Sequence, residues 1–362
     1  MTRQKQKHLP GQMVGIATGG LLSLMTSIGH RAGLFDTMAS LPPSTSQQIA
    51  EATNLNERYV REWLGSMTTG GIIEYDPAST SYRLPLEHAA SLTRAAGPGN
   101  LAALAQFVSL FGNVEDKLVD SFRNGGGVPY SEFSKFQSLM AEVSAGVVDT
   151  TLTNVTLPLI TGMVQRLQDG IDVLDVGCGQ GHAINVMARE FPNSRFTGYD
   201  FSEEGVAASQ AEAKAWGLSN SKFVQQDVAA FSETGAYDLI TAFDAIHDQA
   251  SPTKVLANIA RALRPGGVFL MVDIAGSSNL EDNMAHPMAP LMYAVSTTHC
   301  MTVSLALNGE GLGTMWGEQL ARQKLADARL QQRRRQVRTW RHHEQLLHSD
   351  NGIDLLNQTE DR

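Results

Sequence analysis

The second half of the chain contains short apolar runs, separated by longer stretches in which apolar residues recur every three or four positions. Short runs are typical of buried strands, and the recurring pattern is typical of helices that pack one face against a sheet. The runs predict strands over residues 173–176 and 195–200. Strands that alternate with helices in this way predict an α/β domain with a parallel sheet.

The first predicted strand ends in a turn with three glycines at spacing two, Gly177, Gly179 and Gly181. Glycine has no Cβ and tolerates positive φ, so this turn allows the backbone to approach a ligand closely. The helix predicted from about residue 183 to 191 presents unpaired N–H groups and a positive dipole end to that ligand. Asp200 ends the next strand, about 20 residues further on, where a carboxylate binds ribose hydroxyls.

The glycine spacing distinguishes two classes of nucleotide ligand. The nicotinamide-binding pattern requires a glycine three residues after Gly179, where this chain has His182. Residues 175–181 resemble instead the acid-x-G-x-G-x-G motif of the class I S-adenosylmethionine-dependent methyltransferases. Residues 223–228, 237–243 and 263–272 resemble the third, fourth and fifth strands of that family, in order. The resemblance implies a Rossmann-like sheet and S-adenosyl-L-methionine as the cofactor. Another nucleotide ligand on a doubly wound sheet is the alternative.

The same resemblance implies a role for the turn and for the end of each strand. Asp175 and the three glycines shape the methionine pocket, Asp200 binds the ribose, and Asp227 meets the adenine amino group. The cofactor-binding residues that it implies are Asp175, Gly177, Cys178, Gly179, Gly181, Asp200, Phe201, Asp227, Val228, Phe243 and Asp244.

A histidine follows the fourth predicted strand, in the sequence Asp244-Ala-Ile-His247-Asp248. Methyl transfer from a sulfonium requires a deprotonated acceptor, and an imidazole with a pKa near neutrality is a suitable base for a phenol or alcohol. The plant O-methyltransferases carry their catalytic base at a similar His-Asp pair, which implies His247 here. Those enzymes have Trp after the pair, where this chain has Gln249. His247 as the base and His247 as a wall of the cofactor pocket therefore both stay open.

Residues 13–95 predict a winged helix. Ser44 to Gln48 form a capping box that opens one helix, and Asn56 caps a second helix. The apolar positions of the second helix are Tyr59, Val60, Trp63, Leu64 and Met67. Residues 72–75 and 81–84 flank a turn and predict a β-hairpin.

The charge of this module bears on whether it binds DNA. Residues 1–95 contain eight Lys and Arg and seven Asp and Glu, a net charge of +1, and the second helix is neutral. Contacts to phosphates dominate affinity for DNA, and this module offers few. The winged helix of small-molecule O-methyltransferases dimerises and caps the substrate pocket, so the resemblance implies a homodimer. DNA binding is the alternative.

Two further segments are candidates for contact with the acceptor. Within a helical connector over residues 96–150, residues 133–140 resemble the helix that borders the cofactor and acceptor in plant O-methyltransferases; a core stripe explains them equally well. Residues 276–317 are rich in methionine and predict a substrate lid, because Met surfaces adapt to varied apolar ligands. Core packing explains the individual methionines. The candidate substrate residues are Phe136, Met140, Tyr293, His299 and Trp316.

Composition predicts a cytoplasmic protein of two domains. A length of 362 residues exceeds what one core holds, and two cysteines, Cys178 and Cys300, give no disulfide framework. No window approaches about 18 consecutive apolar residues, so we expect neither a signal peptide nor a membrane span. A net charge of −9 argues against generic nucleic-acid binding. His286, His299 and Cys300 lack a compact ligand spacing, so no metal site is expected.

The resemblance extends to about residue 328, which bounds a methyltransferase domain over residues 151–328. Residues 329–362 form a divergent polar and basic tail, without the two apolar runs of the antiparallel hairpin that finishes the family's sheet. We expect the last two strands to be missing or altered, which exposes a sheet edge and lowers stability. A cooperative melt above about 50 °C, typical of mesophilic domains, contradicts that expectation.

The function implied is methyl transfer from S-adenosyl-L-methionine to a small-molecule acceptor, on oxygen. Two alternatives stay open at this point: a cofactor-sensing, winged-helix regulator that binds DNA, and a methyltransferase-like protein that binds cofactor without catalysis.

Overall fold

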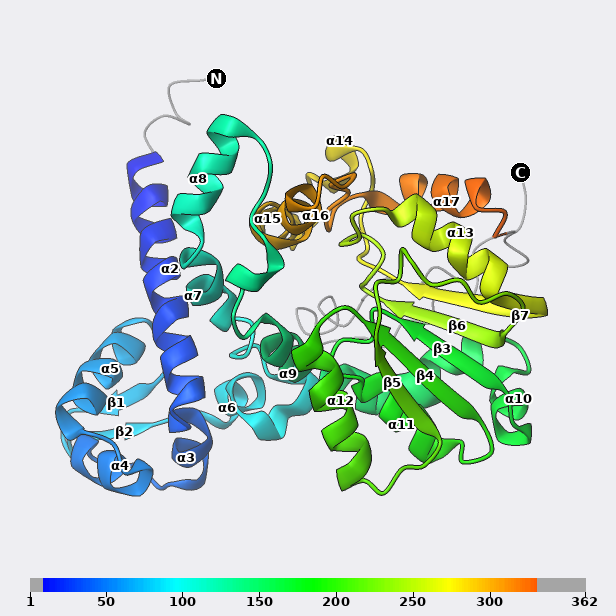
Figure 1. Ribbon diagram of the computed structural model, residues 1–362. Helices are drawn as coiled ribbons and strands as arrows, with labels where there is room; N and C mark the ends of the chain where they lie inside the picture. Colours follow the sequence, from blue (N-terminus) through cyan, green and yellow to red (C-terminus); the bar gives the residue numbers. More distant parts are fainter. Residues whose placement is uncertain (1–8, 331–362) are drawn as a thin grey trace, which may run out of the picture.

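The computed structural model describes residues 9–330, and Figure 1 shows two bodies joined by a helical connector. The larger body contains a parallel sheet of five described strands in the order β5-β4-β3-β6-β7. The strands are β3 (Asp172–Val176), β4 (Arg195–Asp200), β5 (Ser221–Gln225), β6 (Tyr237–Phe243) and β7 (Leu263–Val272). The α/β fold predicted from the apolar runs is therefore confirmed.

Helices cover both faces of the sheet, because successive residues of a strand point to opposite faces. Val173 and Leu239 are fully buried against one helical layer, and Leu174 and Ile240 are fully buried against the other. The first layer contains α10 (Met163–Asp169), α11 (His182–Glu190) and α12 (Glu203–Ala215), and the second contains α13 (Pro252–Ala262) and α17 (Gly317–Asp327). The sheet is thus a rigid support for the loops at its ends.

The order of the strands reverses between β3 and β6. From β3 the chain adds β4 and then β5 on one side, and it later adds β6 and β7 on the other. Open α/β sheets bind ligands outside the carboxyl ends of their strands at such a point. The loop after β3 begins at Gly177 and the loop after β6 begins at Asp244, so both predicted site loops meet there.

The smaller body is a winged helix, as the sequence predicts. Its elements are α3 (Leu34–Ser40), α4 (Ser46–Thr53), α5 (Glu57–Thr69), β1 (Glu74–Asp76), β2 (Ser81–Arg83) and α6 (Leu86–Leu92). The backbone N–H of Gln48 donates to the Thr45 hydroxyl, and the Thr45 N–H donates to the Gln48 side chain, so the capping box is present. The Asn56 side chain caps α5 by accepting from the Arg58 N–H at 3.1 Å.

The predicted apolar face of α5 is wrong at one residue, Tyr59, which is 79% exposed. Val60, Trp63, Leu64 and Met67 are buried, and they follow the i, i+3, i+4, i+7 spacing of one helix face. Tyr59 precedes this set by one position, so the turn of roughly 100° between successive helical residues places it in solvent.

The connector consists of short helices: η1 (Arg94–Gly99), α7 (Gln106–Gly112), α8 (Glu115–Asn124), η2 (Tyr130–Glu132), α9 (Phe136–Thr151), η3 (Leu152–Thr156) and η4 (Leu157–Leu159). The sequence predicts a helical connector over residues 96–150, and within it the structure separates α7 from α8 at Asn113 and Val114. Val114 is buried in an apolar cluster with Leu118 and Val303, so packing against a distant segment accompanies the break.

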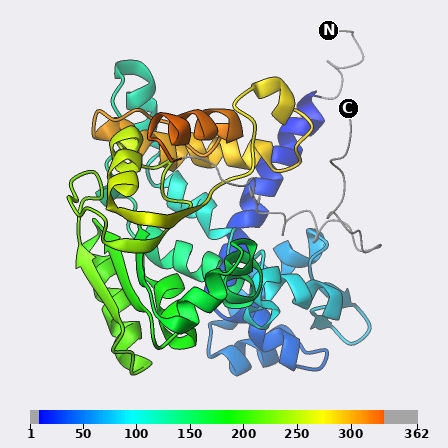
Figure 2. The ribbon, with the colours of Figure 1, turned by 90° about the vertical axis from the view of Figure 1, so that its right-hand side faces the viewer.

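The segment predicted as a lid is largely helical. It contains α14 (Leu280–Asn283), α15 (Ala289–Val295), the π-helical turn η5 (Ser296–Cys300) and α16 (Met301–Ala306). Figures 1 and 2 show α15 and α16 between the connector and α17. The Ser304 hydroxyl of α16 donates to the Gln249 carbonyl at 3.0 Å, so this segment contacts the loop after β6.

Helix α2 (Leu9–Arg31) precedes the winged helix and extends away from it (Figure 1). By length and composition it is apolar enough to cross a membrane, although only 17% of its most apolar window is buried. The expectation that no window reaches this level is therefore wrong. Glycine, serine and threonine interrupt the apolar residues of α2, and its mean hydropathy nevertheless reaches the level of a membrane-spanning helix.

The divergent tail predicted for residues 329–362 falls almost entirely outside the described residues. Within residues 9–330, β7 pairs with β6 alone and lies at an edge of the sheet. Its side chains are half-buried or exposed, whereas those of β3 are mostly buried.

Candidate active site

The turn after β3 requires glycine at all three predicted positions. Gly177, Gly179 and Gly181 have φ values of 74°, 56° and 70°, which side chains rarely adopt. A Cβ on Gly181 lies 2.5 Å from the Phe223 ring, and a Cβ on Gly177 lies 2.6 Å from Ala245. The loop after β6, which contains Ala245, is therefore packed directly against the glycine turn.

Asp200 is held against this turn. The Gly179 N–H donates to one carboxylate oxygen of Asp200 at 2.8 Å, and the Ser202 N–H donates to the other at 2.9 Å. Asp200 is 5% exposed, and burial raises the pKa of its carboxyl group above the ordinary value. The structure thus brings together the turn and the predicted ribose-binding acid.

Asp175 lies inside the sheet rather than at its surface. Its carboxyl group is 2% exposed and accepts a hydrogen bond from the Thr241 hydroxyl of β6 at 2.6 Å. Burial raises the pKa of Asp175 to about 7. The bond to Thr241 joins β3 to β6 at the point where the strand order reverses.

The other predicted cofactor residues lie around this point. Cys178 is half-buried in the turn, and Phe201 is 51% exposed with its ring 4.9 Å from that of Tyr130. Asp227 is exposed two residues beyond the end of β5, where it accepts from the Ala229 N–H at 2.8 Å. No described hydrogen bond joins Asp227 to the glycine turn. Val228 is buried in the second apolar layer, and half-buried Phe243 ends β6.

Asp244 occupies a strained backbone position directly after β6. Its φ is +50°, and its N–H donates to the Val272 carbonyl at 2.9 Å. One of its carboxylate oxygens is buried and accepts no hydrogen bond from the described residues. Burial, followed by the charge of Asp273, raises the pKa of Asp244. Strain of this kind in a non-glycine residue is frequent at functional sites.

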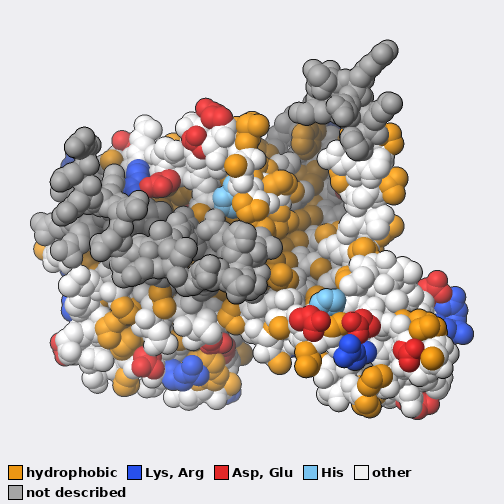
Figure 3. All heavy atoms as spheres, turned by 180° about the vertical axis from the view of Figure 1, so that it is seen from behind, with side chains coloured by type: hydrophobic (Ala, Val, Ile, Leu, Met, Phe, Trp, Pro, Cys, Tyr) orange, Lys and Arg blue, Asp and Glu red, His pale blue; other side chains and the backbone are white. Residues whose placement is uncertain are grey.

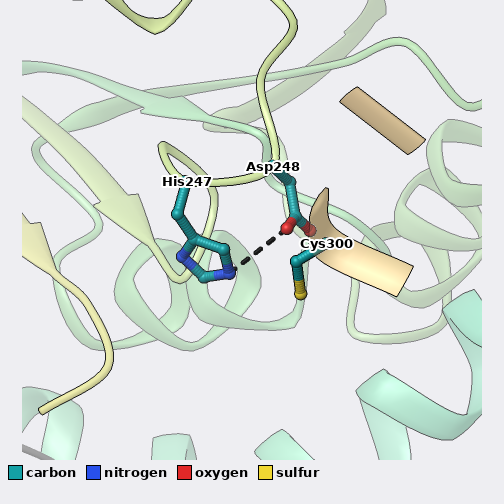
Figure 4. A group of neighbouring side chains, drawn as sticks. All are labelled: His247, Asp248 and Cys300. Carbon is teal, nitrogen blue, oxygen red and sulfur yellow. Dashed lines mark ion pairs between the residues drawn. The ribbon is translucent and has the colours of Figure 1, made fainter. Parts of the chain in front are cut away.

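His247 lies between two carboxylates and is 3% exposed. Its Nδ1 is 2.7 Å from Oδ1 of Asp273, and its Nε2 is 3.2 Å from Oδ1 of Asp248 (Figure 4). Burial by itself lowers the pKa of His247, and the charges of Asp273 and Asp248 outweigh it and hold that pKa well above its usual range. The imidazole is therefore fixed in orientation and paired at both nitrogens.

Asp273, which the sequence analysis missed, orients His247. It directly follows β7, and its Oδ1 also accepts from the Trp316 Nε1–H at 3.2 Å and from the Ile274 N–H at 2.8 Å. An acid at the end of a parallel strand is the signal that identified Asp200, and Asp273 carries the same signal. Predicted residue Trp316 thus supports the histidine through Asp273.

A segment of the connector covers the turn, and two of its residues were also missed. The side-chain oxygen of Gln137 lies 3.3 Å from the position that a Cβ on Gly179 takes. Burial, then the charges of Asp200 and Asp248, raise the pKa of the Tyr130 phenol. Tyr130 therefore lies near both Asp200, the predicted ribose-binding acid, and Asp248, the acid beside His247, although these two acids follow different strands.

The structure joins two of the predicted substrate residues to each other. The rings of Phe136 and His299 stack with centroids 3.6 Å apart. His299 is fully buried, neither ring nitrogen has a described hydrogen-bond partner, and burial lowers its pKa to about 4. Tyr293 accepts a hydrogen bond from Asn283 at 3.1 Å, and half-buried Met140 lies in α9; no described contact joins these two to the stacked pair.

Comparison with known proteins matches two families to the two bodies. A model of the Rv2258c-like winged HTH domain matches residues 20–94, and a model described as a methyltransferase domain matches residues 167–343. A trans-aconitate 2-methyltransferase of Acidovorax sp. is 31% identical over 128 residues, which cover 32% of this chain and 48% of that protein. The chain spans about half the length of the curated relatives it matches.

Solved structures resemble the chain over nearly its whole length. Mitomycin 7-O-methyltransferase has a TM-score of 0.67 at 18% identity, over 90% of this chain and 93% of that one. Human N-acetylserotonin methyltransferase, in complex with SAM, has a TM-score of 0.64 at 15% identity, over 91% and 92%. These likenesses show the fold. Residues 20–94 therefore belong to the Rv2258c-like winged helix-turn-helix domains, and residues 167–343 belong to the methyltransferase domains of class I fold.

Proposed function

We propose that this chain transfers a methyl group from S-adenosyl-L-methionine to an oxygen of a small-molecule acceptor, with His247 as the general base. The observation that carries the proposal is the position of His247, whose loop packs on the glycine turn while Asp273 holds its Nδ1 at 2.7 Å. A cofactor pocket and an oriented imidazole at the same strand ends are the two parts that the reaction requires.

The residues at the turn fit the proposed cofactor. A Cβ on Gly179 meets only the end of the flexible Gln137 side chain, so this glycine leaves room for a ligand to approach the backbone. Asp200 keeps acceptor lone pairs for ribose hydroxyls beside the two backbone N–H groups that it accepts from. Asp227 is exposed and keeps one oxygen free of described hydrogen bonds for the adenine amino group. When bound, the cofactor supplies an electrophilic methyl group.

The chemistry of the chain's own residues is then limited to orientation and proton transfer. Asp273 fixes the imidazole plane through Nδ1, and Trp316 fixes Asp273. Nε2 of His247 accepts the proton of an acceptor hydroxyl as the oxygen attacks the methyl group. The pKa of His247 is raised, so positive charge on a bound cofactor assists by returning the imidazole to its neutral form.

Calorimetry with S-adenosyl-L-methionine tests the cofactor site. We expect micromolar binding by the full chain and loss of binding in Asp200→Ala, because Asp200 is the acid that contacts the glycine turn. The matched control is Asp248→Ala, a neighbouring acid on the other side of His247, which keeps cofactor binding. A folded chain that does not bind the cofactor contradicts the proposal.

Transfer to a panel of phenols and alcohols tests the base. We expect His247→Ala to lower turnover by about 10²–10⁴-fold, which is the usual contribution of a general base. Cofactor affinity is expected to remain, which separates this result from loss of the binding site. If His247→Ala turns over as fast as the unchanged chain, His247 is a pocket wall and the base lies elsewhere.

We propose that the winged helix is a dimerisation and substrate-capping module rather than a DNA-binding domain. On α5, Arg58 pairs with Glu62 and Arg61 pairs with Glu57, each within the helix. Arginines that are paired in this way are less available to phosphates. Duplex binding whose affinity falls steeply with salt contradicts this assignment and supports the regulator instead.

We also propose that the chain is a homodimer. Helix α2 exposes large apolar residues along its length, namely Leu9, Met13, Val14, Ile16, Leu21 and Ile28. Figure 3 shows hydrophobic side chains along this helix and in the hollow beside it. A second copy of the same helix offers the matching apolar surface, and closed two-fold pairing is the commonest arrangement of soluble proteins.

A further inference from the structure

Three potential metal ligands converge at the carboxyl end of β6. Figure 4 shows His247 and Asp248 from the loop after β6 and Cys300 from the end of η5. One ligand atom from each residue lies within 4.8 Å of the other two, and Nε2 of His247 is 3.2 Å from Oδ1 of Asp248. His247 and Cys300 are buried, and the Asp248 side chain is 25% exposed.

The acidic groups around this site outnumber their described counter-charges, because His247 is the one described cation that pairs with both Asp248 and Asp273. Oδ1 of Asp248, Oδ2 of Asp273 and Oδ1 of Asp244 are buried, and none of them accepts a hydrogen bond from the described residues. Three carboxyl groups thus surround one imidazole. Carboxylates in excess of their counter-charge are costly to bury, and a bound cation compensates that cost.

The surroundings of two ligands are those of a prepared site. Asp273 holds Nδ1 of His247, and a carboxylate at the second nitrogen is the usual support of a metal-binding histidine. Cys300 ends a π-helical turn, a geometry that is rare and frequent at functional sites. The Thr314 hydroxyl donates to its sulfur at 3.0 Å, which directs the thiol.

We propose that His247, Asp248 and Cys300 bind a divalent transition-metal ion that favours sulfur and nitrogen, such as Zn²⁺. Bonds of about 2.0–2.3 Å in a tetrahedral site separate ligand atoms by roughly 3.3–3.7 Å. Nε2 of His247 and Oδ1 of Asp248 are already 3.2 Å apart, so the Cys300 sulfur needs to move inward by up to about 1 Å, and the fourth position stays open. Calcium and magnesium, which prefer oxygen ligands, do not suit a thiolate and an imidazole.

Occupancy has a consequence that rests on the proposed function. The metal ion takes the lone pair of Nε2, which is the same lone pair that the proposed base uses. A bound ion therefore stops proton transfer to His247, and methyl transfer is expected to fall in proportion to occupancy.

Titration with Co²⁺, which reports its ligands by absorption, tests the site without any substrate. Cys178 and Cys300 are the two cysteines of the whole chain, so a thiolate-to-cobalt band in the near ultraviolet identifies one of them. We expect one equivalent of Co²⁺ to produce the band, Cys300→Ser to abolish it, and Cys178→Ser to keep it. Zn²⁺ is expected to displace the cobalt.

Two further variants keep the test decisive if Cys300→Ser unfolds. His247→Gln is expected to abolish the band, and Asp273→Asn is expected to weaken Co²⁺ affinity by about 10–100-fold, as for other groups that support a metal-binding histidine. No thiolate band in the folded chain, or a band that Cys300→Ser and His247→Gln both retain, overturns the site.

Activity measurements then separate metal binding from its expected effect, which is inhibition of methyl transfer. If one equivalent of Zn²⁺ inhibits methyl transfer and a chelator reverses the inhibition, the result supports competition between the metal ion and the proton for the Nε2 lone pair of His247. Full turnover by the cobalt-saturated chain overturns the predicted inhibition, and the metal site identified by the thiolate-to-cobalt band still stands. Because the titration requires no cofactor, its outcome is also independent of the calorimetry with S-adenosyl-L-methionine.

Discussion

At the scale of single residues, the three glycines of the turn serve different purposes. A Cβ on Gly181 is 2.5 Å from Phe223 and 2.6 Å from Ser209, so this glycine allows α12 and β5 to pack behind the turn. A Cβ on Gly179 meets only the Gln137 side chain, at 3.3 Å. Gly181 is thus required for packing, and Gly179 is the position at which the turn is open to a ligand.

Alanine substitutions are expected to separate these purposes. Gly179→Ala costs about 1–2 kcal/mol of unfolding free energy, because its left-handed backbone disfavours a Cβ, and it abolishes cofactor binding. Gly181→Ala costs about 1–3 kcal/mol more, because the added methyl group also overlaps buried side chains. Urea denaturation and calorimetry of both variants check this. Equal losses of stability contradict the distinction.

At the scale of elements, His182 joins three helices. It is the first residue of α11, its Nδ1 is 2.8 Å from Glu212 of α12, and its Nε2 is 3.0 Å from Asp149 of α9. The hydrogen bond that His182 donates to Glu212, opposed by burial, raises the pKa of His182 above its ordinary value of 6.5. The connector helix that covers the glycine turn is therefore attached to the sheet domain partly by charge.

This attachment is expected to depend on pH. The folded-state pKa of His182 exceeds the unfolded value, so its stabilisation is complete below about pH 6.5 and is lost as the pH rises through the folded value. His182→Ala should cost about 1 kcal/mol of unfolding free energy at pH 6 and less at pH 9. Urea denaturation at both pH values measures this difference in cost. Glu212→Gln should likewise lower the free energy of unfolding more at pH 6 than at pH 9. An equal cost at both values contradicts the assignment.

At the scale of the whole molecule, α2 is the feature that the fold of one chain does not explain. A helix of 23 residues with 17% of its most apolar window buried leaves an apolar surface in water. Such a surface is stable when a partner covers it, and the same length and hydropathy also suit a lipid bilayer. We propose that a second copy covers this surface; within one chain, α2 packs on the winged helix, where the Trp63 Nε1–H donates to the Met25 carbonyl at 2.8 Å.

A charge on this surface is expected to change the oligomeric state. Val14→Glu and Leu21→Glu should convert a dimer to a monomer, because a carboxylate is costly to bury at an apolar interface. Light scattering after size exclusion measures the mass. Leu280→Glu, at a similarly exposed apolar residue outside α2, is the matched control and should remain dimeric. A monomeric unchanged chain that binds phospholipid vesicles through α2 contradicts the dimer.

The parts of this molecule that depend on neighbours in sequence were predictable from the sequence alone. Apolar runs predicted β3 and β4, the glycine spacing predicted the turn, and the caps at Thr45 and Asn56 predicted two helix starts, while the family resemblance implied β5, β6 and β7. Each depends on a backbone period or on a local hydrogen bond, which residues a few positions apart determine. The predicted positions of Asp200 and His247 followed from the same rule, because both come directly after strands.

Only the tertiary structure decided which side chains surround His247. Asp273 and Cys300 are 26 and 53 residues from it in sequence, and they reach it through the pairing of β6 with β7 and through the π-helical turn η5. The break between α7 and α8 was likewise decided by packing, whereas the exposure of Tyr59 follows from the helical period itself. Local patterns carry no information on such contacts, because the free energy that forms them comes from burial between segments that are distant in the chain.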